Sequence, residues 1–294
     1  MRIGLGIGLN RFRVGQAAAI TGLLDQFTGA AAAFSLDTLI YGDHSVEDTA
    51  VGSQTNGSTD TYTVRVRRSS DNAVRSFTHT EVGDGTLVTW VGAGNDGFVE
   101  DWYNQGSAGD AVQTTAANQP KIVDAGSLVV ENGKAALDYP PGDTNMSTPH
   151  VLASGFAFFT VAKYSTSVKA LIANSYLSSI PANRYVIGEI GLGNISFRSS
   201  GTTDTGYPST NALHLGTFVG DGSGNVSAYF NSSFSESSTG NETNFSGNTY
   251  IGGLEGPADR TFEGNMQCIV IYNNVVTTNR LAIESALNDY YEIY

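Results

Sequence analysis

The amino-acid sequence predicts an all-β protein with a short helix at its C-terminal end and an extended arm at its N-terminal end. Its 294 residues include 35 glycines, 14 tyrosines and 14 phenylalanines, a composition typical of strands joined by tight turns. Short segments that alternate apolar and polar residues recur up to Tyr272, as expected of strands with one buried face. The segment after Asn274 instead carries apolar residues at helical spacing.

Charge, hydropathy and cysteine content exclude several classes of protein. The formal net charge is -13 and the pI is about 4.5, which argues against a nucleic-acid partner, because binding phosphates needs clusters of Lys and Arg. No stretch approaches the ~20 apolar residues of a membrane span. Cys268 is the single cysteine, so no intrachain disulfide or cysteine-based zinc site can form. Alternation places Cys268 within a strand, where we expect a buried, inert thiol.

Residues 1–29 differ from the rest of the chain. Glycine alternates with Ile or Leu, Arg11 and Arg13 follow, and the small residues 16–24 could form one short helix. Such a segment has too little apolar surface to fold alone. It is either a frayed terminus or an anchor that orders by strand addition on a partner or on its own copies, and we favour the anchor.

Residues 30–294 are expected to form one domain, because no linker divides them. Residues 62–70 form a strand with Tyr62, Val64 and Val66 on one face, and residues 155–164 form a strand that is apolar throughout and therefore buried. The polar residues 42–61 form a loop. Further strands are expected at 171–173, 184–190, 195–198, 213–219 and 226–230.

The last 46 residues have the clearest pattern. A strand at 249–253 is followed by a polar turn at 254–259 and by a strand at 265–272. The face formed by Met266, Cys268, Val270 and Tyr272 is apolar, and the other face becomes apolar at Ile269 and Ile271. A helix follows, opened by Thr277 or Thr278, with its stripe at Leu281, Ile283, Ala286, Leu287, Tyr290 and Tyr291.

This order of strand, Asn-rich turn and closing helix resembles the C-terminal end of laminin-G-like (concanavalin-A-like) domains. The resemblance implies a two-sheet antiparallel β-sandwich whose common ligand is carbohydrate. It therefore implies two parts: an arm at 1–29 and a concanavalin-A-like sandwich at 30–294.

An earlier ordered set of motifs carries a second resemblance. It is similar to the N-terminal part of arabinofuranosidase B catalytic domains, and the same set recurs in virion proteins of tailed phages. Its members are Phe34-Ser35-Leu36, residues 66–72, Trp102-Tyr103-Asn104-Gln105 and Gln119-Pro120-Lys121-Ile122.

The arabinofuranosidase resemblance implies Glu189 as a catalytic nucleophile. Retaining glycosidases need a second carboxyl group about 5 Å away. The family carries another acid just before the nucleophile, where this chain has Ile187 and Gly188, and it carries cysteines that this chain lacks. Asp221 and Asp259 are candidates for the acid/base by position in loops. We therefore favour a protein that is not an enzyme; if it is one, we expect a retaining glycoside hydrolase.

Five consecutive residues are candidate sugar ligands: an aromatic ring can stack on sugar C–H groups, and planar polar side chains can bind hydroxyls. A tryptophan on a strand is more often a core residue, and Asn104 stands where the family pattern has an acid. We favour a structural role for the segment, which comprises Asp101, Trp102, Tyr103, Asn104 and Gln105.

No cofactor or metal is expected, although calcium stays open because residues 221–225 and Asp259 offer oxygen ligands. The same residues form ordinary turns. The basic cluster Arg65, Arg67 and Arg68 is expected to form ion pairs with nearby acids, and contact with an acidic glycan is the less favoured alternative.

The combined resemblances imply a structural protein of a tailed-phage virion: a fibre, spike or capsid-decoration component. It would assemble in the host cytoplasm and be displayed on the virion surface. The implied partners are other virion proteins through the arm 1–29, further copies of the chain, and host-surface glycans. Two alternatives stay open: a glycoside hydrolase of the arabinofuranosidase type, and a purely structural decoration protein with no ligand.

Overall fold

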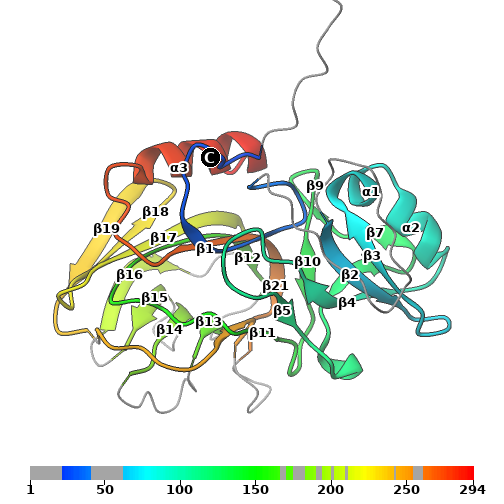
Figure 1. Cartoon of the computed structure of the whole chain (residues 1–294), viewed down its shortest axis with the longest axis horizontal. Helices are drawn as coiled ribbons and strands as arrows, with labels where there is room; N and C mark the ends of the chain where they lie inside the picture. Colours follow the sequence, from blue (N-terminus) through cyan, green and yellow to red (C-terminus); the bar gives the residue numbers. More distant parts are fainter. Residues whose placement is uncertain are drawn as a thin grey trace, which may run out of the picture.

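In the part of the chain that the structure describes, a continuous antiparallel network of 19 strands folds into two facing layers (Figure 1). The computed structural model describes residues 22–40, 62–165, 170–174, 183–189, 194–199, 202–208, 211–241, 243–253 and 261–294. The predicted all-β sandwich with a C-terminal helix is confirmed. The loops expected at 42–61 and 254–259 lie outside the described residues.

The longer layer extends through both lobes seen in Figure 1. Its central strand is β21 (Gly264–Tyr272), which pairs with β12 (Gly155–Tyr164) along one edge. Along its other edge, β21 pairs first with β10 (Leu137–Tyr139) and then with β1 (Ala30–Ser35). Beyond β12 lie β17 (Leu213–Asp221), β18 (Val226–Phe230) and β19 (Ser233–Ser238), and beyond β10 lie β6 (Lys121–Asp124), β4 (Gly97–Trp102), β2 (Tyr62–Arg68) and β3 (Val74–Thr78).

The second layer packs against only one half of the first, the half that contains β12 and β17. It consists, in spatial order, of β5 (Ala111–Val112), β11 (Met146–Thr148), β20 (Thr249–Ile251), β13 (Ala170–Ala173), β14 (Val186–Glu189), β15 (Asn194–Arg198) and β16 (Thr202–Pro208). β5 also pairs with β4, which joins the two layers. Three short strands complete the list: β7 (Ser127–Leu128), which extends β6, and the hairpin β8 (Val130–Glu131) and β9 (Lys134–Ala135).

Two short helices were not expected from the sequence. They lie in the smaller of the two lobes, together with β2, β3, β4, β6 and β7 (Figure 1). α1 (His79–Gly83) starts with a capping box, in which Thr78 accepts from the backbone of Glu81 and the Glu81 side chain accepts from the backbone of Thr78. α2 (Thr86–Val91) follows after a tight turn, and a single 3-10 turn forms at Ala116–Asn118. Five- and six-residue helices are too short to show a periodic apolar pattern, so the sequence gives no clear signal for them.

Aromatic rings fill the space between the two layers. Phe156 and Phe158 of β12 meet Tyr185 and Phe197 of the second layer, with ring centroids 5.4 Å apart for Phe156 and Phe197 and 5.8 Å apart for Phe158 and Tyr185. The other face of β12 packs Phe159 and neighbouring residues against the C-terminal helix. The strand is thus buried on both faces, which confirms the expectation from its unbroken apolar run.

The prediction that Met266 and Cys268 share one face of β21 was wrong, because the strand contains a β-bulge. The pairing with β12 shifts between Val161, opposite Cys268, and Ala162, opposite Met266. The inserted residue reverses the alternation, so Met266 lies in the core between the layers, whereas Cys268 lies on the helix side. The four residues predicted to share one apolar face therefore divide between two cores.

The C-terminal helix α3 (Arg280–Tyr291) covers the outer face of the longer layer (Figure 1). Its buried side chains include Ile283, Leu287 and Tyr291, whereas Leu281, predicted on the same stripe, is 59% exposed. Neither Thr277 nor Thr278 opens it, since the N-cap is Asn279 without a side-chain hydrogen bond. None of the helices in the described ranges is long and apolar enough to cross a membrane.

Part of the predicted arm packs on the sandwich. Leu24 and Phe27 are buried in the same core as α3, and the Tyr272 hydroxyl donates to the Phe27 carbonyl at 2.8 Å. The rest of the arm, residues 1–21, lies outside the described residues. The anchoring role and the boundary at residue 29 stay predictions.

Two leucines of α3 form a matched pair for a stability test. Leu287→Ala is expected to lower the free energy of unfolding by about 2–5 kcal/mol, because it opens a cavity in the core under the helix. Leu281→Ala is expected to stay within about 0.5 kcal/mol of the wild type. Urea unfolding followed by tryptophan fluorescence measures both; equal losses would contradict the placement of α3.

Candidate functional site

Six residues from six neighbouring strands lie in one row across the longer layer. Cross-strand pairing sets Arg67 opposite Phe98, Phe98 opposite Lys121 and Lys121 opposite Asp138. Asp138 lies opposite Asn265, which lies opposite Lys163. Directly paired residues point to the same face of a sheet. We call this row the polar strip: Arg67, Phe98, Lys121, Asp138, Asn265 and Lys163.

The alternation of each strand turns these side chains outward. Their sequence neighbours Val66, Val99, Ile122, Leu137 and Met266 are fully buried in the core. The strip residues themselves are half-buried, with 22% of the Lys121 side chain and 28% of the Lys163 side chain exposed. At ~4.8 Å per strand, the five spacings of the strip give it a length of roughly 24 Å.

Arg67 anchors one end of the strip. Its Nε donates to Gln119 Oε1 at 2.9 Å and its Nη1 donates to Asn72 Oδ1 at 2.8 Å. The guanidinium carbon lies 4.7 Å from the centroid of the Phe98 ring. These two hydrogen-bond partners and the ring are neutral, so they orient the guanidinium plane without cancelling its charge.

Carboxylates surround the middle of the strip. Lys121 Nζ lies 2.8 Å from Asp124 and 3.0 Å from Asp96, and it lies 5.8 Å from the Phe98 ring centroid. Burial raises the pKa of Asp138, and the charge of Lys121 partly opposes this rise. The middle of the strip therefore combines an ammonium group, a ring and a partly desolvated carboxyl group.

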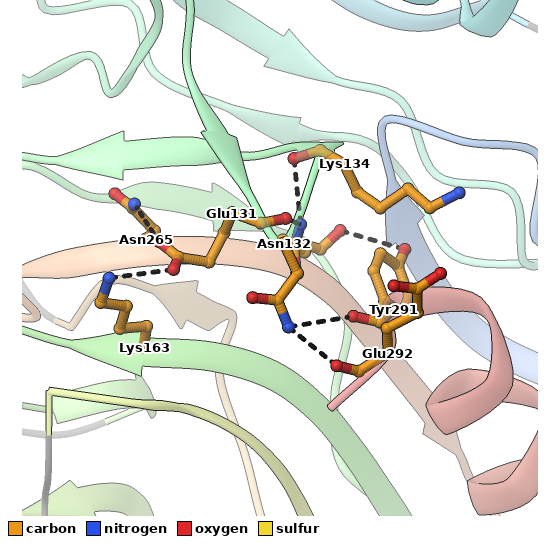
Figure 2. A network of polar contacts seen from close by, with 8 residues as sticks. Glu131, Asn132, Lys134, Lys163, Asn265, Tyr291 and Glu292 are labelled. Atoms are coloured by element: carbon orange, nitrogen blue, oxygen red, sulfur yellow. Dashed lines mark hydrogen bonds and ion pairs between the residues drawn. The ribbon is translucent and has the colours of Figure 1, made fainter. Parts of the chain in front are cut away.

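The hairpin β8–β9 closes the other end of the strip (Figure 2). Glu131 accepts from Lys163 Nζ at 2.9 Å and from Asn265 Nδ2 at 2.8 Å. Gln267, which is fully buried, donates to the Glu131 carbonyl at 2.8 Å. The polar groups at this end are thus held in fixed positions.

The turn of the same hairpin ties it to α3. Asn132 and Gly133 have φ angles of 47° and 73°, as a tight two-residue hairpin turn requires. Asn132 Nδ2 donates to the carbonyls of Tyr291 and Glu292, 3.3 and 2.9 Å away, at the end of α3 where carbonyls lack helical partners (Figure 2). The hairpin therefore acts as a cap for the helix.

The predicted aromatic sugar contacts lie inside the protein. Trp102 is fully buried, with its ring centroid 5.6 Å from that of Phe34. The Tyr103 hydroxyl is buried and hydrogen-bonded to Ser76 at 2.7 Å. Neither ring presents an open face to a ligand, because both fill the core beside β1 and β2.

Asn104 and Gln105 bind the backbone of the first described segment. Asn104 Oδ1 accepts from the Ala33 N–H at 2.7 Å, and its Nδ2 donates to the Ala108 carbonyl at 2.7 Å. Gln105 Oε1 accepts from the Leu39 N–H at 2.7 Å, and its Nε2 donates to the Asp37 carbonyl at 2.8 Å. Both amide groups thus serve to fix β1 and the residues after it.

Asp101 lies on β4 directly opposite Arg65 of β2. Its carboxylate is 3.6 Å from Arg65, which also lies 3.3 Å from Glu100. Together with the pair between Arg68 and Asp71 at 2.7 Å, these contacts confirm the expected ion pairs of Arg65 and Arg68. Arg67 instead donates to the neutral side chains of Gln119 and Asn72.

Glu189 is the last residue of β14, where its backbone pairs with Ile195. Its side chain lies outside the described residues, as does Asp259. Asp221 accepts from the backbone of Ser223 at 2.7 Å and from the side chain of Asn225 at 2.6 Å, which is the hydrogen bonding of a turn. Of the candidate catalytic carboxyl groups, only that of Asp221 is therefore located, and it lies in a turn.

The described ranges contain no group of three or more His, Cys, Asp or Glu side chains arranged to hold a metal ion. Cys268 is fully buried, and burial raises the pKa of its thiol. The polar strip is our candidate binding arrangement. Of its members, Arg67 was named from the sequence in the basic cluster and Lys121 in one of the motifs, without a connection between them. The members of the strip are far apart in the sequence and come together only through strand register.

Comparison with solved structures finds the same fold in two arabinofuranosidase structures. An arabinofuranosidase complexed with arabinofuranosyl-α-1,2-xylobiose is 12% identical, with a TM-score of 0.65 over 90% of this chain and 64% of that chain. A GH54 α-L-arabinofuranosidase soaked with a cyclic sulfate inhibitor is 12% identical, with a TM-score of 0.61 over 90% of this chain and 62% of that one. The chain thus spans less than two thirds of the length of these proteins. No family model and no curated protein matches it.

The identification as a tailed-phage virion protein was wrong. The similar structures are arabinofuranosidases that match 90% of the chain, so one likeness accounts for both the early motifs and the closing segment. Motifs of this kind define strands and turns, and one fold serves many functions. The expected virion partners rested on that identification and have no other support.

A matched pair of asparagines tests the structural role of the predicted sugar-binding segment. Asn104→Ala is expected to lower the free energy of unfolding by about 2–4 kcal/mol, because it leaves buried N–H groups near β1 without acceptors. Asn248→Ala, at an exposed position, is expected to change it by less than about 0.5 kcal/mol. Chemical denaturation measures both, and a fully stable Asn104→Ala variant would show that the amide is dispensable for folding.

Proposed function

We propose that the protein binds carbohydrate along the polar strip. The observation that carries the proposal is the row itself, in which a guanidinium, a ring, an ammonium, a carboxyl and an amide alternate on one sheet face. Sugars present hydroxyls that bind planar polar groups and C–H faces that bind rings. A length of roughly 24 Å suits a chain of several sugars better than a single one.

The fold supports the same proposal. The two arabinofuranosidases were solved with a substituted xylobiose and with a cyclic sulfate inhibitor, and this chain matches both over 90% of its length. We therefore expect arabinose-containing glycans, such as arabinoxylan and arabinan, to be the first ligands to test. The acidic charge of the chain disfavours strongly anionic polymers.

Two arginines of the smaller lobe form a matched test of this site. Arg67→Gln is expected to weaken binding to a soluble arabinoxylan about 10-fold or more, since a charged hydrogen-bond donor is lost from the strip. Arg75→Gln removes an arginine that pairs with Glu81 away from the strip and is expected to leave binding unchanged. Affinity gel electrophoresis compares the variants; equal retardation of both would argue against the strip.

A second candidate function is hydrolysis of arabinofuranosides, favoured by the match to GH54 structures and by the acidic residue Glu189 on β14. Release of 4-nitrophenol from 4-nitrophenyl α-L-arabinofuranoside measures it directly. If the protein is a hydrolase, Glu189→Gln is expected to lower the rate by at least about 100-fold while Arg67→Gln variants still turn over. A wild type that releases no product would leave binding as the function.

A further inference from the structure

An aromatic side chain stands out from the edge of the longer layer. Phe234 of β19 is 61% exposed, more than any other large hydrophobic side chain in the described part of the chain. At ~200 Å² for a full phenylalanine, it exposes roughly 120 Å² of apolar ring. Leaving such a ring in water forgoes the free energy of burying it.

The Phe234 ring packs against the ring of Tyr229 on the neighbouring strand. It lies directly opposite Tyr229 of β18, with the two ring centroids 5.6 Å apart in an edge-to-face arrangement. The guanidinium carbon of Arg280, in the first turn of α3, lies 3.7 Å from the centroid of the Tyr229 ring. We call Tyr229, Phe234 and Arg280 the aromatic platform.

A buried ion pair fixes Arg280 in this position. Arg280 Nη1 donates to Glu284 Oε2 at 2.5 Å, and Glu284 is fully buried. The second carboxylate oxygen of Glu284, Oε1, has no hydrogen-bond partner among the described residues. A buried, half-satisfied carboxylate is costly to keep. Its effect here is to hold the guanidinium over the Tyr229 ring, which in turn contacts the Phe234 ring.

Hydroxyl groups lie beside the platform. The Ser232 and Tyr294 hydroxyls are hydrogen-bonded at 2.5 Å, and Tyr294 is 54% exposed. Asn288 Oδ1 accepts from the Tyr294 N–H at 3.0 Å, which folds the last residues back toward the β18–β19 turn. Ser233, next to Phe234, is exposed as well. These groups add hydrogen-bond donors and acceptors at the same end of the β18–β19 hairpin as Phe234.

We infer that the aromatic platform is a second carbohydrate contact, at which one neutral sugar ring stacks on Phe234. This inference rests on the proposed carbohydrate binding. The exposed ring matches the face of a single sugar, whereas a stable protein interface needs about 800 Å² from each partner. Glu284 balances the charge of Arg280, so the platform has no excess positive charge for an anionic ligand.

The platform is separate from the polar strip. It lies at the β18–β19 edge of the longer layer, while the strip begins at β12 and runs the other way toward β2. α3 crosses the layer in the region between them (Figure 1). A branched or long glycan could occupy both sites, and each site contributes to affinity through a high effective concentration.

Variants at Phe234 test the inference with the full chain and soluble arabinoxylan in affinity gels. Phe234→Ala is expected to weaken retardation about 5- to 10-fold, the effect of losing one stacking contact. Phe234→Tyr, which keeps a ring, is expected to bind as the wild type. Leu281→Ala removes an equally exposed apolar side chain from α3 and serves as the control. Unchanged unfolding midpoints show that the variants are folded.

The outcomes separate the platform from the strip. Retardation of Phe234→Ala equal to that of the wild type, together with a loss in Arg67→Gln, overturns the platform and leaves the strip. A wild type that no neutral polysaccharide retards overturns both sites. A Phe234→Ala variant that changes only the sedimentation coefficient, from dimer to monomer, assigns the ring to contact with a second copy and also overturns the platform.

Discussion

The pairing of β21 on both of its edges is the constraint on which the rest of the structure depends. One edge binds β12 over eight residue pairs, and the other is shared end to end by β10 and β1. β10 pairs with β6, β6 pairs with β4, and β4 pairs with β2. Because β10 is bound to β21, β21 joins the smaller lobe to the sandwich. Displacing β21 would break this connection and leave the pairing of β5 with β4 and β11 as the remaining strand link.

The bulge in β21 sets what each face of the layer carries. It directs Met266 into the core between the layers and Cys268 toward α3, and the residue between them, Gln267, donates to the carbonyls of the β8–β9 hairpin. That hairpin in turn holds Glu131 against Lys163 and Asn265 and caps the end of α3. One inserted residue thus positions the helix and one end of the polar strip together.

The sequence predicted those features that depend on local alternation. β12, β18 and β20 form where unbroken apolar or alternating segments indicated strands, and α3 forms where the apolar residues have helical spacing. The bulge could not be predicted, because it depends on how β21 pairs with β12 rather than on its own pattern. For the same reason Arg67 and Lys121 were named from the sequence without being connected in one strip. Asn104 and Gln105 looked like ligands because buried amides and sugar-binding amides are the same residue types in sequence.

The junction between β6 and β10 is a single residue pair, Lys121 opposite Asp138, and it lies at the middle of the polar strip. Arg67 and Phe98 belong to the smaller lobe, and Asn265 and Lys163 belong to the sandwich. Neither lobe contains the row by itself. The smaller lobe is therefore no removable module: separating it, in the laboratory or in evolution, would cut the same surface in two.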